Sequence, residues 1–248
     1  MAQHPDHDND IADLLGKAAG GDINMTNMRH LVKALKRSLK ISRKGVRLSG
    51  ASLAELMLKT APRIPIRSAE TLSAHHGGMT GSALAGEVIR NAGRSSAAIG
   101  ALTGALASAG ELAPPLWVML PAEVIGETLL IAAIEMKLVA ELHEIYGRPI
   151  HGTHTQRGMA IVEAWSERRG VHIEDLASDD GISHALGRGT RNQLMQMLRR
   201  KLLARAARNI SSLAPLFIGA AAGAEINRRA TRDLGDAVVR DLASTAVR

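Results

Sequence analysis

Cysteine is absent from the 248 residues of this chain, and aromatic residues are scarce: two Trp, one Tyr and one Phe. The absence of cysteine excludes disulfides, thiolate catalysis and zinc sites built on Cys. The chain also lacks the β-branched runs of alternating polarity that are typical of strands. A core without aromatics must be built from Leu, Ile, Val, Met and Ala, which suits closely packed helices. We therefore predict an all-α bundle of about eight helices without a β-sheet.

Long apolar runs are missing as well. The longest uncharged runs, Ser95–Gly110 and Asn209–Ala224, have 16 residues each, whereas a membrane-spanning helix needs about 20 mostly apolar residues. The N-terminus, MAQHPDHDNDIADLL, has neither the basic nor the apolar region of a signal peptide. We expect a cytoplasmic protein without a spanning helix. Residues 1–24 are predicted to form a polar flexible tail, and residues 25–248 a single all-helical domain.

Recognisable catalytic motifs are also lacking: there is no phosphate-binding P-loop, no nucleophile elbow and no zincin motif. The best metal-ligating candidates are His143, His151 and His154, but their spacing matches no standard metal site. We expect a non-catalytic protein without a cofactor. A metal-dependent enzyme that uses these three histidines is the less favoured alternative.

The most prominent feature that is present is a long predicted helix between Pro121 and Gly147, residues typical of a helix start and a helix stop. At about 100° per residue, one apolar face contains Val124, Thr128, Ile131, Leu138 and Leu142. The opposite side is predicted to be polar, with Glu123, Glu127, Lys137, Glu141 and Glu144. We interpret this segment as the central helix of the core.

Glu135 is the exception, because it falls in the middle of the apolar face. A carboxylate in that position must be paired, hydrogen-bonded or protonated, since an unpaired buried charge is very costly. The favoured interpretation is a buried ion pair with Arg228, Arg229 or an arginine of residues 191–208. The alternative is a functional proton site or ligand site.

Two predicted helical segments are rich in Gly and Ala. Residues 82–91 are expected to form a helix that ends at Gly93, and residues 95–109 a second helix that contains Gly100-x-x-x-Gly104. The last predicted helix, residues 216–243, begins with Gly219-x-x-x-Gly223. Such spacing lets two helix backbones approach closely, so we expect these helices to pack around the central helix.

The net charge of +7 is unevenly distributed. Residues 23–54 have eight basic residues and no acid, and residues 181–224 have seven and no acid, which leaves −8 for the rest. Basic amphipathic helices are predicted at about residues 28–42 and 190–212. The residues expected to bind an anionic surface are Arg29, Lys33, Lys36, Arg37, Lys40, Arg43, Lys44, Arg47, Arg199, Arg200, Lys201 and Arg205.

Such charge segregation indicates an anionic partner. We expect an anionic membrane surface or a membrane protein, with the chain lying at the inner face of the cell membrane. Nucleic acid is the alternative, but there is no clear helix-turn-helix pattern and there are almost no aromatics to stack on bases.

Two segments resemble the EcsC family of bacterial proteins. The long helix is similar in its Pro-x-acid start, Pro121 and Glu123, its apolar body, and its Tyr146-Gly147 end. The C-terminal segment resembles a family pattern of small residues followed by Asn, Thr and Gly: Pro215, Gly219, Gly223, Asn227, Thr231 and Gly235. The resemblance covers about residues 50–245 and implies an all-helical, membrane-associated accessory protein. It implies no catalytic residues, because the family has no known molecular role.

Overall fold

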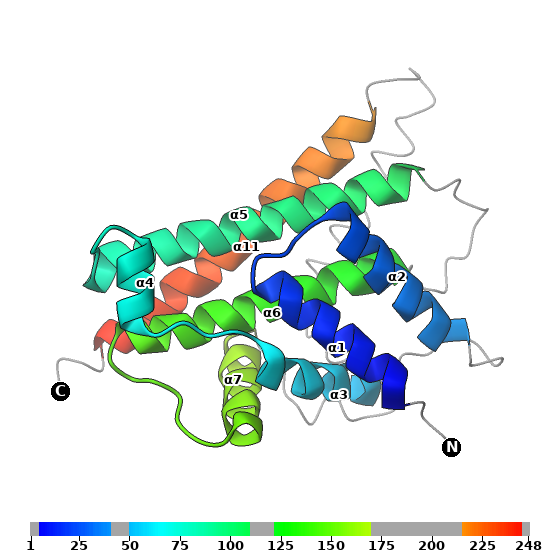
Figure 1. Cartoon of the computed structure of the whole chain (residues 1–248). Coiled ribbons are helices and arrows are strands. Elements are labelled where there is room, and N and C mark those ends of the chain that lie inside the picture. Colours follow the sequence, from blue (N-terminus) through cyan, green and yellow to red (C-terminus); the bar gives the residue numbers. More distant parts are fainter. Residues whose placement is uncertain (1–4, 41–49, 110–121, 170–214, 245–248) are drawn as a thin grey trace.

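The computed structural model describes residues 5–40, 50–109, 122–169 and 215–244, and side chains within 8–35, 55–102, 126–169 and 224–244. This part of the chain contains eight α-helices, one short 3-10 helix and no strand (Figure 1). The predicted all-α class is thereby confirmed. The elements are α1 (Pro5–Ala19), α2 (Met25–Lys40), α3 (Gly50–Thr60), η1 (Ala61–Arg63), α4 (Ala69–His75), α5 (Gly81–Ala109), α6 (Ala122–Ile145), α7 (His154–Arg169) and α11 (Pro215–Ser244).

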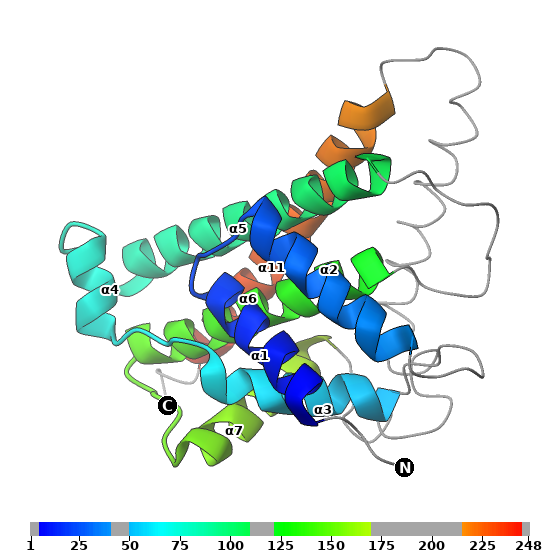
Figure 2. The ribbon, with the colours of Figure 1, turned by 45° about the vertical axis from the view of Figure 1, so that its right-hand side comes forward.

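Helix α6 lies at the centre and contacts α1, α2, α5, α7 and α11 (Figure 2). Within residues 126–142, every residue is buried except Thr128, Ile131 and Lys137, which are half-buried. The helix ends where the sequence predicts: Gly147 has a φ of +67°, and the Arg148 amide donates 2.8 Å to the carbonyl of His143. The interpretation of this segment as the central core helix is confirmed.

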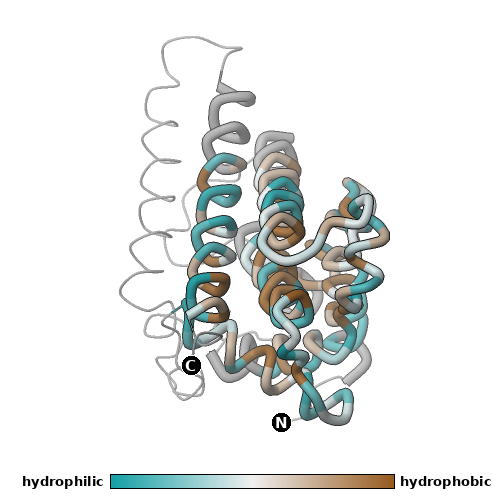
Figure 3. Tube along the Cα trace, turned by 90° about the vertical axis from the view of Figure 1, so that its left-hand side faces the viewer, coloured by the Kyte–Doolittle hydropathy of each residue, from teal (hydrophilic) through white to brown (hydrophobic). Residues whose placement is uncertain are grey.

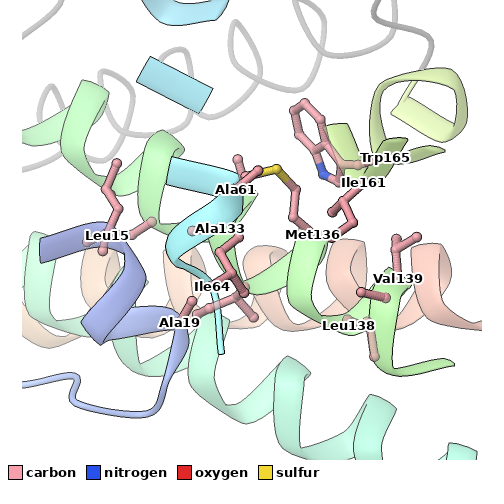
Figure 4. Packing of buried hydrophobic residues seen from close by; sticks show 14 of the residues in the cluster. Leu15, Ala19, Ala61, Ile64, Ala133, Met136, Leu138, Val139, Ile161 and Trp165 are labelled. Carbon is pink, nitrogen blue, oxygen red and sulfur yellow. The ribbon is translucent and has the colours of Figure 1, made fainter. Parts of the chain in front are cut away.

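The core is aliphatic, as the composition requires. Leu15 of α1, Ile64 of the connector after η1, and Met136 of α6 belong to one cluster of buried side chains (Figure 4). Trp165 of α7 joins the same cluster and is its largest member. Figure 3 shows hydrophobic and hydrophilic residues alternating along the helices, the pattern of helices that bury one side against their neighbours.

The prediction of a flexible tail at residues 1–24 is wrong, because residues 5–19 form α1. Ile11, Ala12 and Leu15 of this helix are almost completely buried against the rest of the bundle. On its polar side, Asp8 pairs with Lys59 at 3.1 Å and Asp13 pairs with Arg63 at 2.6 Å. The acidic residues therefore cover the outer side of a packed helix.

The expected break at Gly93 is also wrong, since α5 continues through it as one helix of 29 residues. A glycine inside a helix costs about 1 kcal/mol relative to alanine. Here it allows α11 to come close: a Cβ at Gly93 would lie 3.3 Å from the carbonyl oxygen of Arg228. Gly235 makes the reciprocal approach to Ile89 of α5. The Gly/Ala helices thus pack side by side, as expected (Figures 1 and 2).

The sequence signals at the start of α7 and in the last helix are confirmed. Helix α7 begins with a reciprocal capping box, in which Thr153 N donates to Gln156 Oε1 at 3.0 Å and Gln156 N donates to Thr153 Oγ1 at 3.4 Å. The predicted last helix is confirmed as α11. The predicted basic helix at 190–212 lies outside the described residues. None of the described helices is long and apolar enough to cross a membrane.

Candidate functional site

Helix α6 carries three carboxylates into the core. Glu127, Glu135 and Glu141 are 4%, 1% and 2% exposed, respectively. Burying a carboxylate is costly unless it is paired and hydrogen-bonded. Each of the three has a polar partner from another segment, and the best-connected one is Glu135.

Glu135 accepts hydrogen bonds on both carboxylate oxygens. Arg169, the last residue of α7, donates from Nε to Oε2 at 3.0 Å and from Nη2 to Oε1. The indole Nε1 of Trp165, one turn earlier on α7, donates to Oε2 at 3.0 Å. Thr231 Oγ1 of α11 donates to Oε1 at 3.1 Å. Each oxygen therefore has two donors, which satisfies the carboxylate.

The network extends to a fourth helix through Thr231. Its Oγ1 also lies 2.8 Å from Oγ of Ser96 on α5, and a hydroxyl has a single proton to share between these two acceptors. Arg169 Nη2 donates in addition to the carbonyl of Ala230 at 3.2 Å. We call Ser96, Glu135, Trp165, Arg169 and Thr231 the Glu135 network; it joins α5, α6, α7 and α11.

The predicted buried position of Glu135 is confirmed, but the predicted partners Arg228 and Arg229 are wrong. Both of these arginines pair instead with Glu225 on their own helix. Residues 191–208, the other predicted source of a partner, lie outside the described residues. A sequence signal for the true partner did exist: Trp165 and Arg169 are four residues apart, so they share one face of α7.

Glu141 and Lys137 were predicted on a polar side of the long helix, and this is wrong for Glu141. Its carboxylate is held bidentately by Arg67 of the α3–α4 connector, with Nε to Oε1 at 2.7 Å and Nη2 to Oε2 at 2.9 Å. Lys137 Nζ lies 3.8 Å from Oε1. Hydrogen bonding to Glu141 raises the pKa of Arg67. Desolvation lowers the pKa of Lys137, and the charge of Arg67 adds to this effect while Glu141 opposes it.

Two further acids on that predicted polar side also have partners from other helices, while the side chain of Glu123 lies outside the described residues. Glu127 is buried, contrary to the prediction, and its Oε1 accepts 2.8 Å from Asn227 Nδ2 of α11. Glu144, half-buried, pairs with Arg157 of α7 at 3.0 Å. Helix α6 looks amphipathic in sequence, but other helices surround it in the structure. Its acids form hydrogen bonds and ion pairs with these neighbours.

The three histidines do not form a metal site. His143 Nδ1 lies 2.8 Å from the carbonyl oxygen of Val139, within its own helix. His151 and His154 are exposed. Among the residues whose structure is described, no group of three His, Asp or Glu side chains could hold a metal ion. The metal-dependent alternative has no ligand set in this part of the chain.

The predicted basic surface is described in part. In α2, Met28, Leu31, Val32 and Leu35 are buried, whereas Arg29 and Lys33 are exposed. Lys36, Arg37 and Lys40 belong to the same helix, but their side chains lie outside the described residues. The other predicted residues, Arg43, Lys44, Arg47, Arg199, Arg200, Lys201 and Arg205, also lie outside the described residues.

Comparison with known proteins found no family model, no curated protein and no solved structure that matches this chain. The structure does give a physical reason for the C-terminal sequence pattern. Asn227 donates a hydrogen bond to Glu127, and Thr231 donates one to Glu135. Gly235, which has no side chain, leaves room for Ile89. These three residues recur every four positions, so they form the stripe of α11 that faces α6 and α5.

Proposed function

We propose that this chain is a non-catalytic helical protein of the EcsC type that docks on the anionic inner surface of the cytoplasmic membrane, as an accessory to a transport or membrane protein complex. One observation carries the proposal. Helix α2 has a buried apolar face and an exposed face with Arg29 and Lys33, and it contains no acidic residue.

The burial of the apolar face decides the mode of docking. Met28, Leu31, Val32 and Leu35 already pack inside the bundle, so they are not available to insert between lipids. Attraction between the basic face and anionic headgroups then supplies the affinity, at about 1 kcal/mol for each Lys or Arg near the surface. Such attraction weakens as salt screens the charges. We therefore expect salt-sensitive peripheral binding.

The Glu135 network supports a structural rather than a catalytic role for this buried acid. Its carboxylate already accepts four hydrogen bonds from three side chains. A general acid or base must reach the proton of a substrate. The contacts of Glu135 instead fix the mutual positions of α6, α7 and α11.

The test is flotation of the full chain with vesicles of phosphatidylcholine alone and with added phosphatidylglycerol, at low and high salt. We expect binding only to the anionic vesicles and release at high salt. The double variant Arg29→Gln/Lys33→Gln should lower the affinity by about tenfold or more. The matched control Lys17→Gln/Arg240→Gln removes the same charge from exposed residues outside α2 and should bind better than the α2 variant.

Equal loss of binding in both double variants would show that only net charge matters and would contradict docking through α2. Absence of binding to any vesicle would remove the proposal altogether. A salt-dependent shift with DNA, combined with no binding to anionic vesicles, would favour the nucleic-acid alternative.

A further inference from the structure

Lys137 of α6 belongs to a cluster of three charged side chains, together with Glu141 one turn further along the helix and Arg67 of the α3–α4 connector. The side chain of Lys137 is 13% exposed, that of Arg67 33% and that of Glu141 2%. Two cations share one carboxylate, so the cluster has one surplus positive charge. A charge that is largely removed from water is costly unless it is well paired.

Arg67 occupies the carboxylate and leaves Lys137 only a weak contact with it. The Nε and Nη2 of Arg67 donate to the two oxygens of Glu141 at 2.7 and 2.9 Å, and the Arg67 backbone N donates to Oε1 at 3.4 Å. Lys137 Nζ lies 3.8 Å from Oε1, which is longer than a hydrogen bond. Among the described residues, no other acid pairs with Lys137. Its ammonium group is therefore the poorly compensated charge of the cluster.

These surroundings favour the neutral amine of Lys137, which is the nucleophilic form. Burial lowers its pKa, and the charge of Arg67 adds to this effect. Desolvation and a neighbouring cation are the two features that activate lysines as nucleophiles in proteins. Lys59 has the opposite surroundings: its Nζ lies 2.8 Å from Glu55 and 3.1 Å from Asp8, and hydrogen bonding to Glu55 raises its pKa. The two lysines should therefore differ in reactivity.

We propose that Lys137 is an acylation site, which reacts directly with acyl phosphates. Its neutral Nζ attacks the carbonyl carbon of the donor, an N–C bond forms, and the bond between this carbon and the phosphate oxygen breaks. Phosphate leaves with the electron pair, and the nitrogen releases a proton to water. The surplus positive charge of the cluster favours this class of donor, because it attracts the anionic phosphate group. The product is a neutral amide, so the cluster keeps one cation and one anion.

The test uses the full chain, incubated with acetyl phosphate at neutral pH. Mass spectrometry of proteolytic peptides measures the rate of acetylation at each lysine. Lys17, which is exposed on α1, is the internal reference. We expect Lys137 to react about threefold or more faster than Lys17, although it is less exposed. In guanidinium chloride the two lysines should react at similar rates, because the cluster no longer exists in the unfolded chain.

The variant Arg67→Gln tests the role of the neighbouring cation. Without the Arg67 guanidinium, the carboxylate of Glu141 can pair with Lys137, so the rate at Lys137 should fall to that of Lys17 or below. Arg63→Gln is the matched control, because the Arg63 side chain is 35% exposed, compared with 33% for Arg67, and pairs with α1 instead. It should leave the rate at Lys137 unchanged. Circular dichroism checks that both variants are folded.

A rate at Lys137 no higher than that at Lys17 in the folded wild type would overturn the proposal. A preference for Lys137 that persists in guanidinium chloride would also overturn it, since the preference would then arise from the local sequence. The same holds for a preference that persists in folded Arg67→Gln. If Arg67→Gln does not fold, the comparison of native and unfolded wild type decides.

Discussion

Thr231 of α11 and Glu135 of α6 are joined by a hydrogen bond of 3.1 Å in the centre of the bundle, and the same hydroxyl lies 2.8 Å from Ser96 of α5. The rise of an α-helix is about 1.5 Å per residue, and hydrogen bonds are lost beyond about 3.5 Å. A slide of α11 by a single residue would therefore break these contacts. These hydrogen bonds therefore fix the position of α11 along α5 and α6. Aliphatic packing alone would fix that position less precisely.

Replacing Glu135 with Gln is expected to destabilise the fold by about 3 kcal/mol or more, because it leaves the Arg169 guanidinium facing the core without its counter-charge. Urea unfolding followed by tryptophan fluorescence measures the loss. Glu163→Gln, at an exposed position on α7, is the control and should change little. Vesicle binding by the folded Glu135→Gln protein should equal that of the wild type. Lost binding with unchanged stability would instead support a functional site.

Lys137 gives a prediction on pH. Burial lowers its pKa below the ordinary value of 10.5. Between the lowered pKa of the folded protein and 10.5, the unfolded chain binds more protons, so this lysine makes stability rise with pH. Below the lowered pKa, the folded protein bears the full cost of the buried charge. Lys137→Met should therefore be more stable than the wild type at neutral pH, and its advantage should shrink as pH approaches 10.5.

Unfolding curves at several pH values between 7 and about 10 check the Lys137 prediction. Lys17→Met is the matched control, because Lys17 is exposed on α1. Its difference from the wild type should show no such trend. A Lys137→Met protein that is less stable than the wild type at pH 7 would mean that the attraction to Glu141 outweighs desolvation.

The close approach of α5 and α11 can be tested at Gly235. A Cβ there would lie 2.7 Å from Cγ1 of Ile89, so Gly235→Ala should cost about 1–3 kcal/mol of stability through overpacking. Ile89→Ala alone should also destabilise, by about 2–5 kcal/mol, through a cavity. The double variant should lose clearly less than the sum of the two, since the new methyl group occupies the vacated space. Strict additivity would contradict this packing.

Periodicity and end signals predict some of the described helices, although they miss α1 and break α5 at Gly93. The long central helix, its stop at Gly147 and the capping box at Thr153 are where the sequence places them. The interior of the bundle is harder to predict, because burial depends on which neighbours surround a helix. Glu127 and Glu141 look like solvent-facing residues until Asn227 and Arg67 are brought to them from distant segments.

The helix that continues through Gly93 also depends on its neighbours in the fold. As a local signal a glycine favours a helix end, yet here the packing of Arg232 and Arg228 over it outweighs its poor helix propensity. The partner of Glu135 was predicted on the wrong helix for a related reason. In the folded chain Arg169 of α7 lies next to Glu135. The spacing of residues along α6 cannot show which arginine of another helix will lie there.

Helix α1 supplies the last prediction, because its residues read as a polar tail in sequence but pack into the core. Leu15 is 1% exposed and belongs to the central cluster (Figure 4). Leu15→Ala should therefore destabilise the whole bundle by about 2–5 kcal/mol, as in other cores where a buried leucine is truncated. Asp10→Ala, at an exposed position of the same helix, should have little effect. Thermal unfolding by circular dichroism measures both. If α1 were only loosely attached, Leu15→Ala would unfold with the wild-type midpoint; a cooperative downward shift would show that this helix belongs to the folding unit.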